Sequence, residues 1–180
     1  MKHINIILVA ICLFSSWTFS QNEPPPAANV LLQSAMTKAA GQKAVFVIFH
    51  ASWCKWCTRL DHVLDTMVVK DIVDKYFVTL HIDVLERGEK IQVFENPNGQ
   101  KLLEQFGGKD AGLPFYAFLD AHKKLIGNSN VMSKNENIGY PGSTDEINAF
   151  MKLIKKAAPR MTRKEESIIV DCLQKNAPKQ

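Results

Sequence analysis

The pattern of apolar and polar positions predicts helices that alternate with short strands. Residues 44–49 (AVFVIF) form a wholly apolar run rich in β-branched and aromatic residues, which favours a central strand covered on both faces. Further strands are predicted at residues 77–83, 115–119 and 124–127. Helical spacing of apolar residues predicts helices at residues 29–39, 54–67, 102–106, 143–154 and 162–172. This order indicates an α/β protein with a mixed sheet flanked by helices.

Capping residues mark the start of several predicted helices. Asn29 is the expected N-cap of the first helix. Capping boxes open the last two helices, formed by Ser143 with Glu146 and by Thr162 with Glu165. The apolar face of the second helix is expected to consist of Leu60, Val63, Leu64 and Met67.

The first twenty residues have the three-part layout of a secretory signal peptide. A short basic start precedes an apolar stretch from Ile4 to Phe14, and small residues lead up to Ser20, where cleavage is expected. About 16 apolar residues fall short of the roughly 20 that a membrane helix needs, which makes an uncleaved anchor the weaker alternative. Residues 21–28 (QNEPPPAA) indicate an extended proline-rich linker. We therefore predict an exported protein, periplasmic or secreted, without a membrane span after cleavage.

Charge and cysteine content narrow the class of protein. A formal net charge of +4 falls well short of the clustered basic surface of a nucleic-acid-binding domain, so no nucleic-acid partner is expected. Of the four cysteines, Cys12 lies in the predicted signal peptide. Cys172 lies on the apolar stripe of the last helix, where a lone cysteine acts as a small hydrophobe, although it could also pair with a second subunit. Cys54 and Cys57 remain as the pair that can carry chemistry.

Cys54 and Cys57 stand at a predicted strand-to-helix junction with two residues between them. Backbone N–H groups and the helix dipole favour an anion at a helix N-terminus, so we expect a lowered pKa for the Cys54 thiol and a role as nucleophile. Cys57, one turn further along, would attack the mixed disulfide and release the reduced substrate. Lys55 adds a positive charge that would favour the Cys54 thiolate, unless it is an ordinary exposed residue at a helix start.

The surrounding sequence resembles the active site of the thioredoxin superfamily, in particular its exported members and disulfide interchange proteins. The matching features, in order, are the apolar strand 45–49, the run Ala-Ser-Trp-Cys-Lys-Trp-Cys at 51–57, a strand ending in Ile82-Asp83, and Leu113-Pro114 ahead of the next strand. The resemblance implies a thioredoxin fold in which Trp53 shields the dithiol. It also implies that Pro114 is cis beside the cysteines, and that the Leu113 backbone is available to pair with an extended substrate.

The residues between the cysteines depart from the standard thioredoxin pattern. Lys55 and Trp56 stand where thioredoxins have Gly-Pro, so redox potential and partner choice do not carry over from the family. Together with Trp53, Leu113 and Pro114, these two residues are expected to support the dithiol.

A second departure concerns proton transfer. Ile48 stands where thioredoxins have a buried acid used in proton transfer, and Thr79 stands where they have the accompanying lysine. Because the acid and the lysine are both absent, neither is left as an unpaired charge in the core. Proton transfer at Cys57 must then use water or another group, and His50 and His81 are the nearest candidates in sequence.

These features predict an exported thiol–disulfide oxidoreductase that exchanges disulfides with protein substrates through Cys54 and Cys57. A reductant or interchange protein is favoured over an oxidant. Neither a bound cofactor nor a metal is expected. The partners would be protein thiols or disulfides and a protein that recharges the dithiol, and we expect a monomer.

Two other functions stay open at this point. In one, the chain is a non-catalytic thioredoxin-like adaptor whose cysteines brace the fold. In the other, His50, Cys54, Cys57 and His62 bind zinc or copper, because H-x3-C-x2-C-x4-H contains suitable ligand types. The geometry of a strand-to-helix junction opposes this site, since it directs His50 back along the sheet and places His62 near the side of the helix opposite Cys57.

The predicted boundaries are residues 1–20 for the signal peptide, 21–28 for the linker, 29–157 for the thioredoxin-like domain and 158–180 for a C-terminal helical extension. Residues 84–112 form a connection longer than a thioredoxin needs, which either shapes a substrate groove or is a surface insertion. Residues 128–142 form a second added loop, whose sequence reveals no ligand.

Overall fold

The computed structural model describes residues 23–178. The predicted signal peptide, with its cleavage position at Ser20, lies outside the described residues. The elements, in chain order, are α1 (Ala28–Ala39), β1 (Ala44–His50), α2 (Lys55–Leu64), α3 (Met67–Tyr76), β2 (Phe77–Asp83), α4 (Lys90–Phe94), α5 (Gly99–Gln105), β3 (Phe115–Leu119), β4 (Leu125–Asn128), a 3-10 turn (Ser133–Asn135), α6 (Thr144–Ala157) and α7 (Arg163–Lys175). No helix between residues 23 and 178 is both long enough and apolar enough to cross a membrane.

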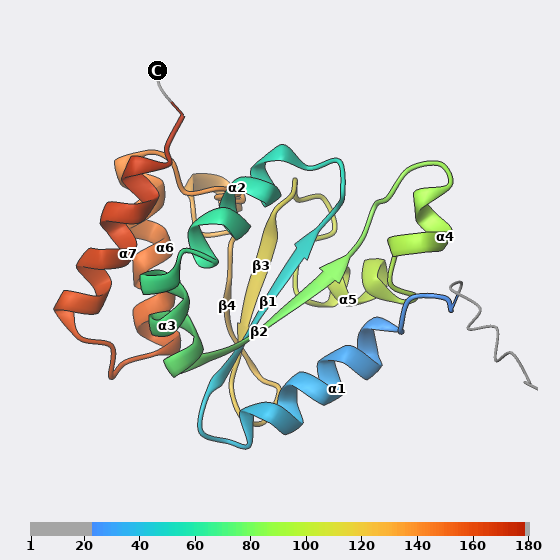
Figure 1. The fold of residues 1–180 in the computed structure, drawn as a ribbon, viewed down its shortest axis with the longest axis horizontal. Coiled ribbons are helices and arrows are strands. Elements are labelled where there is room, and N and C mark those ends of the chain that lie inside the picture. The colour runs from blue at the N-terminus through green and yellow to red at the C-terminus, as the bar shows by residue number, and fades with distance from the viewer. Residues whose placement is uncertain (1–22, 179–180) are drawn as a thin grey trace, which may run out of the picture.

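The four strands form one mixed sheet in the order β2-β1-β3-β4. β1 pairs in parallel with β2, so that Ala44 lies opposite Phe77 and His50 lies opposite Asp83. β1 also pairs antiparallel with β3, which in turn pairs antiparallel with β4. The central strand β1 therefore leads at its carboxyl end into the turn that carries Cys54 and into α2 (Figure 1).

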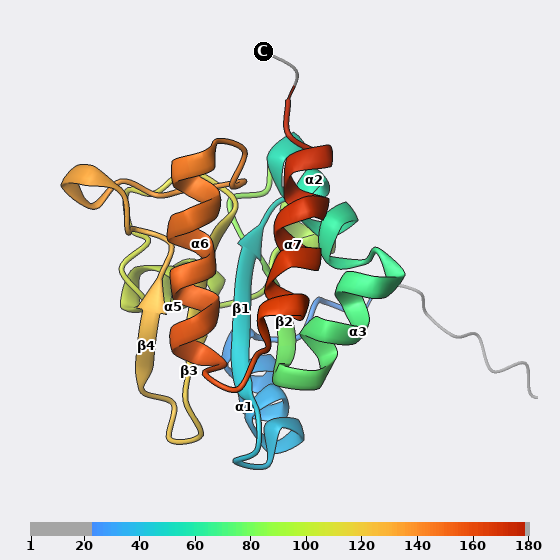
Figure 2. The ribbon, with the colours of Figure 1, turned by 90° about the vertical axis from the view of Figure 1, so that its left-hand side faces the viewer.

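Helices cover both faces of the sheet and give the molecule three layers (Figures 1 and 2). On one face, Phe46 and Ile48 of β1 pack in a core cluster with residues of α2, α3, α6 and α7. On the other face, Val45, Val47 and Phe49 pack with residues of α1 and α5. Burial on both faces explains why residues 44–49 are apolar at every position. The predicted α/β thioredoxin fold is confirmed.

Both predicted capping boxes are present. At the start of α6, the Ser143 hydroxyl accepts the Glu146 N–H and the Glu146 carboxylate accepts the Ser143 N–H. Thr162 and Glu165 make the same pair of hydrogen bonds at the start of α7. The predicted C-terminal helix is therefore real, and it packs on α3 and α6 with Ile169 buried in the shared core.

The prediction of one helix over residues 54–67 is wrong in its length, because this segment contains the end of one helix and the start of another. α2 ends at Leu64, because Thr66 leaves the helical backbone conformation (φ −59°, ψ 124°), and a separate helix, α3, begins at Met67. Met67 consequently lies at the first position of α3 with its side chain 79 % exposed, instead of on the buried face of α2.

Two other helices, α1 and α5, begin at residues that differ from the prediction. Asn29 is not the N-cap of α1, since the helix begins at Ala28, whose N–H donates to the carbonyl of Pro97 at 2.9 Å. The polar connection after β2 contains the short helix α4, and α5 begins at Gly99, three residues earlier than predicted.

Candidate active site

Cys54 and Cys57 form a disulfide at the amino-terminal end of α2. Their Cα atoms lie 5.2 Å apart. Cys54 is the N-cap of the helix, and its Sγ accepts a hydrogen bond from the Cys57 N–H at 3.1 Å. Both side chains are buried in a small cluster with Ala51. Because this sulfur faces helix N–H groups, the position favours a Cys54 thiolate once the disulfide is reduced.

The Leu113-Pro114 segment lies beside the disulfide, and its peptide bond is cis, as the family resemblance implied. Within residues 23–178, no hydrogen bond uses the backbone N–H or carbonyl of Leu113. The carbonyls on either side are anchored, because Asn137 Nδ2 donates to Gly112 at 2.7 Å and to Pro114 at 3.0 Å. The Leu113 backbone is thus free to pair with another peptide segment.

The turn that presents Cys54 is held by the segment after β2. Trp53 Nε1 donates to the Leu85 carbonyl at 2.8 Å, and the Arg87 guanidinium carbon lies 3.9 Å from the centroid of the Trp53 ring. Glu86 is buried, and its carboxylate accepts hydrogen bonds from the N–H and the hydroxyl of Ser52. Residues 85–87 therefore hold Ser52 and Trp53, the two residues ahead of Cys54, and fix the position of the Trp53 indole.

Trp56, between the two cysteines, is part of an aromatic stack. Its side chain is 47 % exposed, and its ring lies on that of Tyr140 with centroids 6.1 Å apart and an interplanar angle of 27°. The Arg59 guanidinium lies 5.3 Å from the Trp56 centroid and 5.8 Å from that of Tyr140. The Tyr140 hydroxyl donates to the Leu173 carbonyl at 3.0 Å. This stack connects the active site to α7.

Two histidines and two aspartates make a chain of polar contacts one helical turn beyond Cys57. His50 Nδ1 lies 3.7 Å from Asp61 Oδ2, and His50 Nε2 lies 3.2 Å from Asp83 Oδ1. The contact between His50 and Asp83 is an ion pair without the alignment of a hydrogen bond. His81 Nε2 lies 3.0 Å from Asp61 Oδ1. Because Asp61 follows Cys57 by four residues in α2, the two side chains share a face of the helix.

The charges in this cluster shift two pKa values. Burial by itself would lower the pKa of His50, but the contacts with the negatively charged side chains of Asp61 and Asp83 outweigh it and raise the pKa to about 9. Burial would raise the pKa of Asp61, yet its contacts with His50 and His81 lower it to about 2. At neutral pH the cluster therefore holds an imidazolium at His50 next to the carboxylate of Asp61.

The structure brings the predicted residues Cys54, Cys57, Trp56 and Leu113 together around one site. Lys55 is exposed at the first turn of α2. Ile48, which stands where thioredoxins have a buried acid, is fully buried in the core. Cys172 is a free, partly buried thiol with its Sγ 3.8 Å from Thr66 Oγ1. His50 and His62 of the alternative metal set have different surroundings: His50 contacts Asp61 and Asp83, whereas His62 lines a hollow with Lys55 and Lys175.

Sequence reasoning missed three residues that support the site, namely Asp61, Glu86 and Asn137. Only Asp61 carried a usable signal, its spacing of four residues from Cys57. Glu86 and Asn137 lie in loops. The partner of Glu86 is 34 residues away along the chain, and the two partners of Asn137 are 25 and 23 residues away.

The sequence and the structure were compared with known proteins. A family model described as thioredoxin-like matches residues 31–121. No curated protein matches the sequence. Among solved structures, a disulphide isomerase from Xylella fastidiosa Temecula1 is 20 % identical over 82 % of this chain and 89 % of that one, with a TM-score of 0.48. A thioredoxin from Thermus thermophilus is 17 % identical (78 % and 94 % covered, TM-score 0.44), and the DsbD c-terminal domain from Neisseria meningitidis is 22 % identical (58 % and 84 % covered, TM-score 0.42).

Proposed function

The chain belongs to the thioredoxin-like family, and we propose that it exchanges disulfides with protein substrates through Cys54 and Cys57, as an exported reductant or interchange protein. The enzyme class, thiol:disulfide oxidoreductase, follows from the family and its disulfide-bonded pair. Export is supported by the signal-like pattern of residues 1–20. Protein thiols or disulfides and a recharging partner complete the proposed cycle.

In the reducing direction, the Cys54 thiolate attacks one sulfur of a substrate disulfide. A Cys54–substrate disulfide forms, the substrate S–S bond breaks, and the departing thiolate takes a proton from water. The Cys57 thiol then loses its proton and attacks Cys54 Sγ, which forms the Cys54–Cys57 disulfide and releases the second substrate thiol. The substrate gains two electrons and two protons, and a donor dithiol must return the pair to its reduced form.

The observation that carries this proposal is the position of the Cys54–Cys57 disulfide beside Leu113. Cys54 caps α2, where its thiolate is favoured, and Leu113 packs against the two cysteines with its backbone unpaired in the described chain. A substrate strand that pairs with Leu113 would place its disulfide against Cys54. In this proposal Trp53, Lys55, Trp56 and Pro114 support the dithiol and do not themselves exchange electrons.

Whether the protein reduces or oxidises its substrates depends on the reduction potential of the Cys54–Cys57 pair. A potential near about −270 mV is the thioredoxin range and supports a reductant, whereas a potential near about −120 mV belongs to a strong oxidant. Equilibration of the protein with glutathione buffers measures this value. We expect it toward the thioredoxin end.

Reduction of insulin by dithiothreitol, with and without the protein, tests the activity itself. We expect the parent protein to accelerate the reaction and Cys54→Ser to abolish the acceleration. Cys172→Ser is the matched control, because it removes a thiol outside the pair and should reduce insulin as the parent does. A parent protein that binds a partner but does not accelerate the reaction would instead indicate an adaptor.

A further inference from the structure

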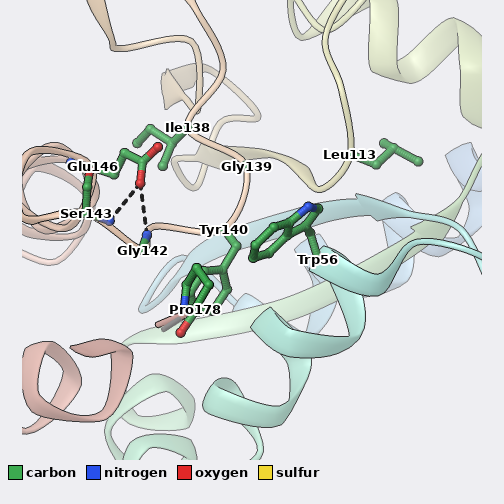
Figure 3. A pocket seen from close by; sticks show the side chains of 9 residues that line it. All are labelled: Trp56, Leu113, Ile138, Gly139, Tyr140, Gly142, Ser143, Glu146 and Pro178. Atoms are coloured by element: carbon green, nitrogen blue, oxygen red, sulfur yellow. Dashed lines mark hydrogen bonds between the residues drawn. The ribbon is translucent and has the colours of Figure 1, made fainter. Parts of the chain in front are cut away.

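A hollow of about 360 Å³ is lined by Trp56 and by Leu113, which packs against the two cysteines, and its lining differs from one end to the other. Figure 3 shows Trp56 and Leu113 at one end, and Glu146 with Ile138 at the other end. The first end is the one beside the cysteines, because Trp56 stands between them in the sequence and Leu113 packs against them. The remaining lining residues are Gly139, Tyr140, Gly142, Ser143 and Pro178. Among the described residues, Glu146 is the one charged residue in this lining. The hollow therefore combines an aromatic wall with a single carboxylate.

One of the two oxygen atoms of the Glu146 carboxylate is hydrogen-bonded to the backbone. Its Oε2 accepts the N–H groups of Gly142 at 3.0 Å and Ser143 at 2.8 Å, which are drawn as dashed lines in Figure 3. No hydrogen bond in the described part of the chain uses its Oε1. The Ser143 hydroxyl and Glu146 Oε2 already satisfy N–H groups at the start of α6, so this helix end does not attract an anion. A free carboxylate oxygen favours a cation.

The aromatic wall suits a long aliphatic stem. Trp56 and Tyr140 stack on one another, and Trp56 leaves nearly half of its surface uncovered. Lysine and arginine side chains lie with their methylene groups along such surfaces while the charged end stays in a polar environment. The volume of the hollow is within the range that holds small ligands.

We propose that this hollow receives a lysine or arginine side chain that flanks the target cysteine of the substrate. The stem of that side chain lies along Trp56 and Tyr140, and its charged end meets Glu146. The inference rests on the proposed function, and it deepens it by naming the substrate class: protein segments with a basic residue next to the disulfide.

A second hollow explains why the basic residue belongs on this side of Trp56. Lys55, Arg59 and Lys175 line the neighbouring hollow, which shares only Pro178 with the first. A basic side chain would be repelled there, whereas the described residues that line the first hollow include a carboxylate and no positive charge. Arg59 lies near the Trp56 and Tyr140 rings but lines the second hollow. The surface next to Trp56 therefore carries negative charge in the first hollow and positive charge in the second.

Disulfide exchange with short peptides tests the proposal. The probes are peptides of one sequence, each carrying a mixed disulfide on a single cysteine, with Lys, Gln or Glu placed on either side of that cysteine. The reduced protein is mixed with each peptide, and the second-order rate constant is measured. At one of the two flanking positions, we expect the Lys peptide to react about fivefold faster than the Glu peptide at low salt, with the difference shrinking in high salt.

Glu146→Gln is the deciding variant. Glutamine also completes a capping box, so the variant keeps the start of α6 while losing the charge. We expect the ratio of Lys to Glu rates to fall to about one. Asp145→Asn is the matched control, because Asp145 carries the same charge in the same helical turn but is exposed and does not line the hollow. It should keep the parent ratio.

Three results are distinguishable. Equal rates for the Lys and Glu peptides at both positions in the parent protein would overturn the inference and leave the proposed function standing. A preference for Lys that persists in Glu146→Gln would also overturn it. No exchange with any peptide, including the Gln peptide, would overturn the proposed function and the inference together.

Discussion

The carboxylate of Glu86 accepts two hydrogen bonds from Ser52, one from its backbone N–H at 2.5 Å and one from its hydroxyl at 2.8 Å. Ser52 stands two residues ahead of Cys54, and Glu86 lies in the segment after β2. Glu86 is fixed in turn, because its N–H donates to Glu95 Oε2 at 2.8 Å. A single buried carboxylate therefore ties the added segment to the turn that presents the reactive cysteine.

Replacement of Glu86 should destabilise this turn. Glu86→Ala removes both hydrogen bonds that Ser52 donates, so we expect the oxidised protein to lose about 1–3 kcal/mol of unfolding free energy. Urea unfolding measures the loss. Glu89→Ala is the control, because Glu89 lies in the same segment but is exposed, and its effect should stay within about 0.5 kcal/mol. Equal losses in the two variants would contradict the supporting role of Glu86.

The raised pKa of His50 predicts a pH-dependent contribution to stability. Its folded-state pKa of about 9 lies above the ordinary value of 6.5, so the stabilisation is complete below pH 6.5 and is lost as the pH rises through 9. The groups that face it are Asp61 and Asp83, with His81 next along the chain of contacts. Asp61 stays ionised across this range, since its pKa is about 2.

His50→Gln isolates that contribution. We expect its loss of unfolding free energy to be larger at pH 6 than at pH 10, by on the order of 3 kcal/mol. Urea unfolding at the two pH values provides the comparison. His122→Gln, at an exposed position in the β3–β4 turn, should show no such pH dependence. A His50→Gln effect of the same size at both pH values would show that folding does not raise the pKa of His50.

Asn137 should affect substrate binding more than the redox chemistry. Asn137→Ala removes the amide that anchors the Gly112 and Pro114 carbonyls, and so loosens the Leu113 backbone between them. We expect KM for a disulfide substrate to rise about fivefold, with kcat and the reduction potential little changed. Ser133→Ala, an exposed change in the same loop, is the control. An unchanged KM in Asn137→Ala would mean that Leu113 does not bind substrate.

Features that depend on neighbouring residues in the chain could be predicted from the sequence. The strand Phe77–Asp83 and the two capping boxes are present as predicted, because alternation, β-branching and the Ser/Thr-x-x-Glu spacing act within a few residues. Met67 shows the limit of this reasoning. Its spacing fits the helical period, but the period does not reveal that the backbone turns at Thr66 and starts a new helix.

Features that depend on distant partners could not be predicted. The cysteine pair and Leu113-Pro114 were recognisable because their residue types are distinctive. The Glu86–Ser52 contact spans 34 residues, and its members are ordinary polar residues of loops. The contact between His81 and Asp61 likewise requires the register that places β2 beside β1 and α2 over the sheet. Only the folded chain brings these groups together.

Mixed-disulfide trapping with Cys57→Ser is the most direct test that Cys54 attacks and Cys57 resolves. The reduced variant is incubated with a protein disulfide substrate such as insulin, and the adduct is located by mass spectrometry of proteolytic fragments. We predict a stable adduct at Cys54, which the parent protein does not accumulate because Cys57 releases it. An adduct at Cys172 instead, or no adduct while the parent protein still reduces the substrate, would contradict the account.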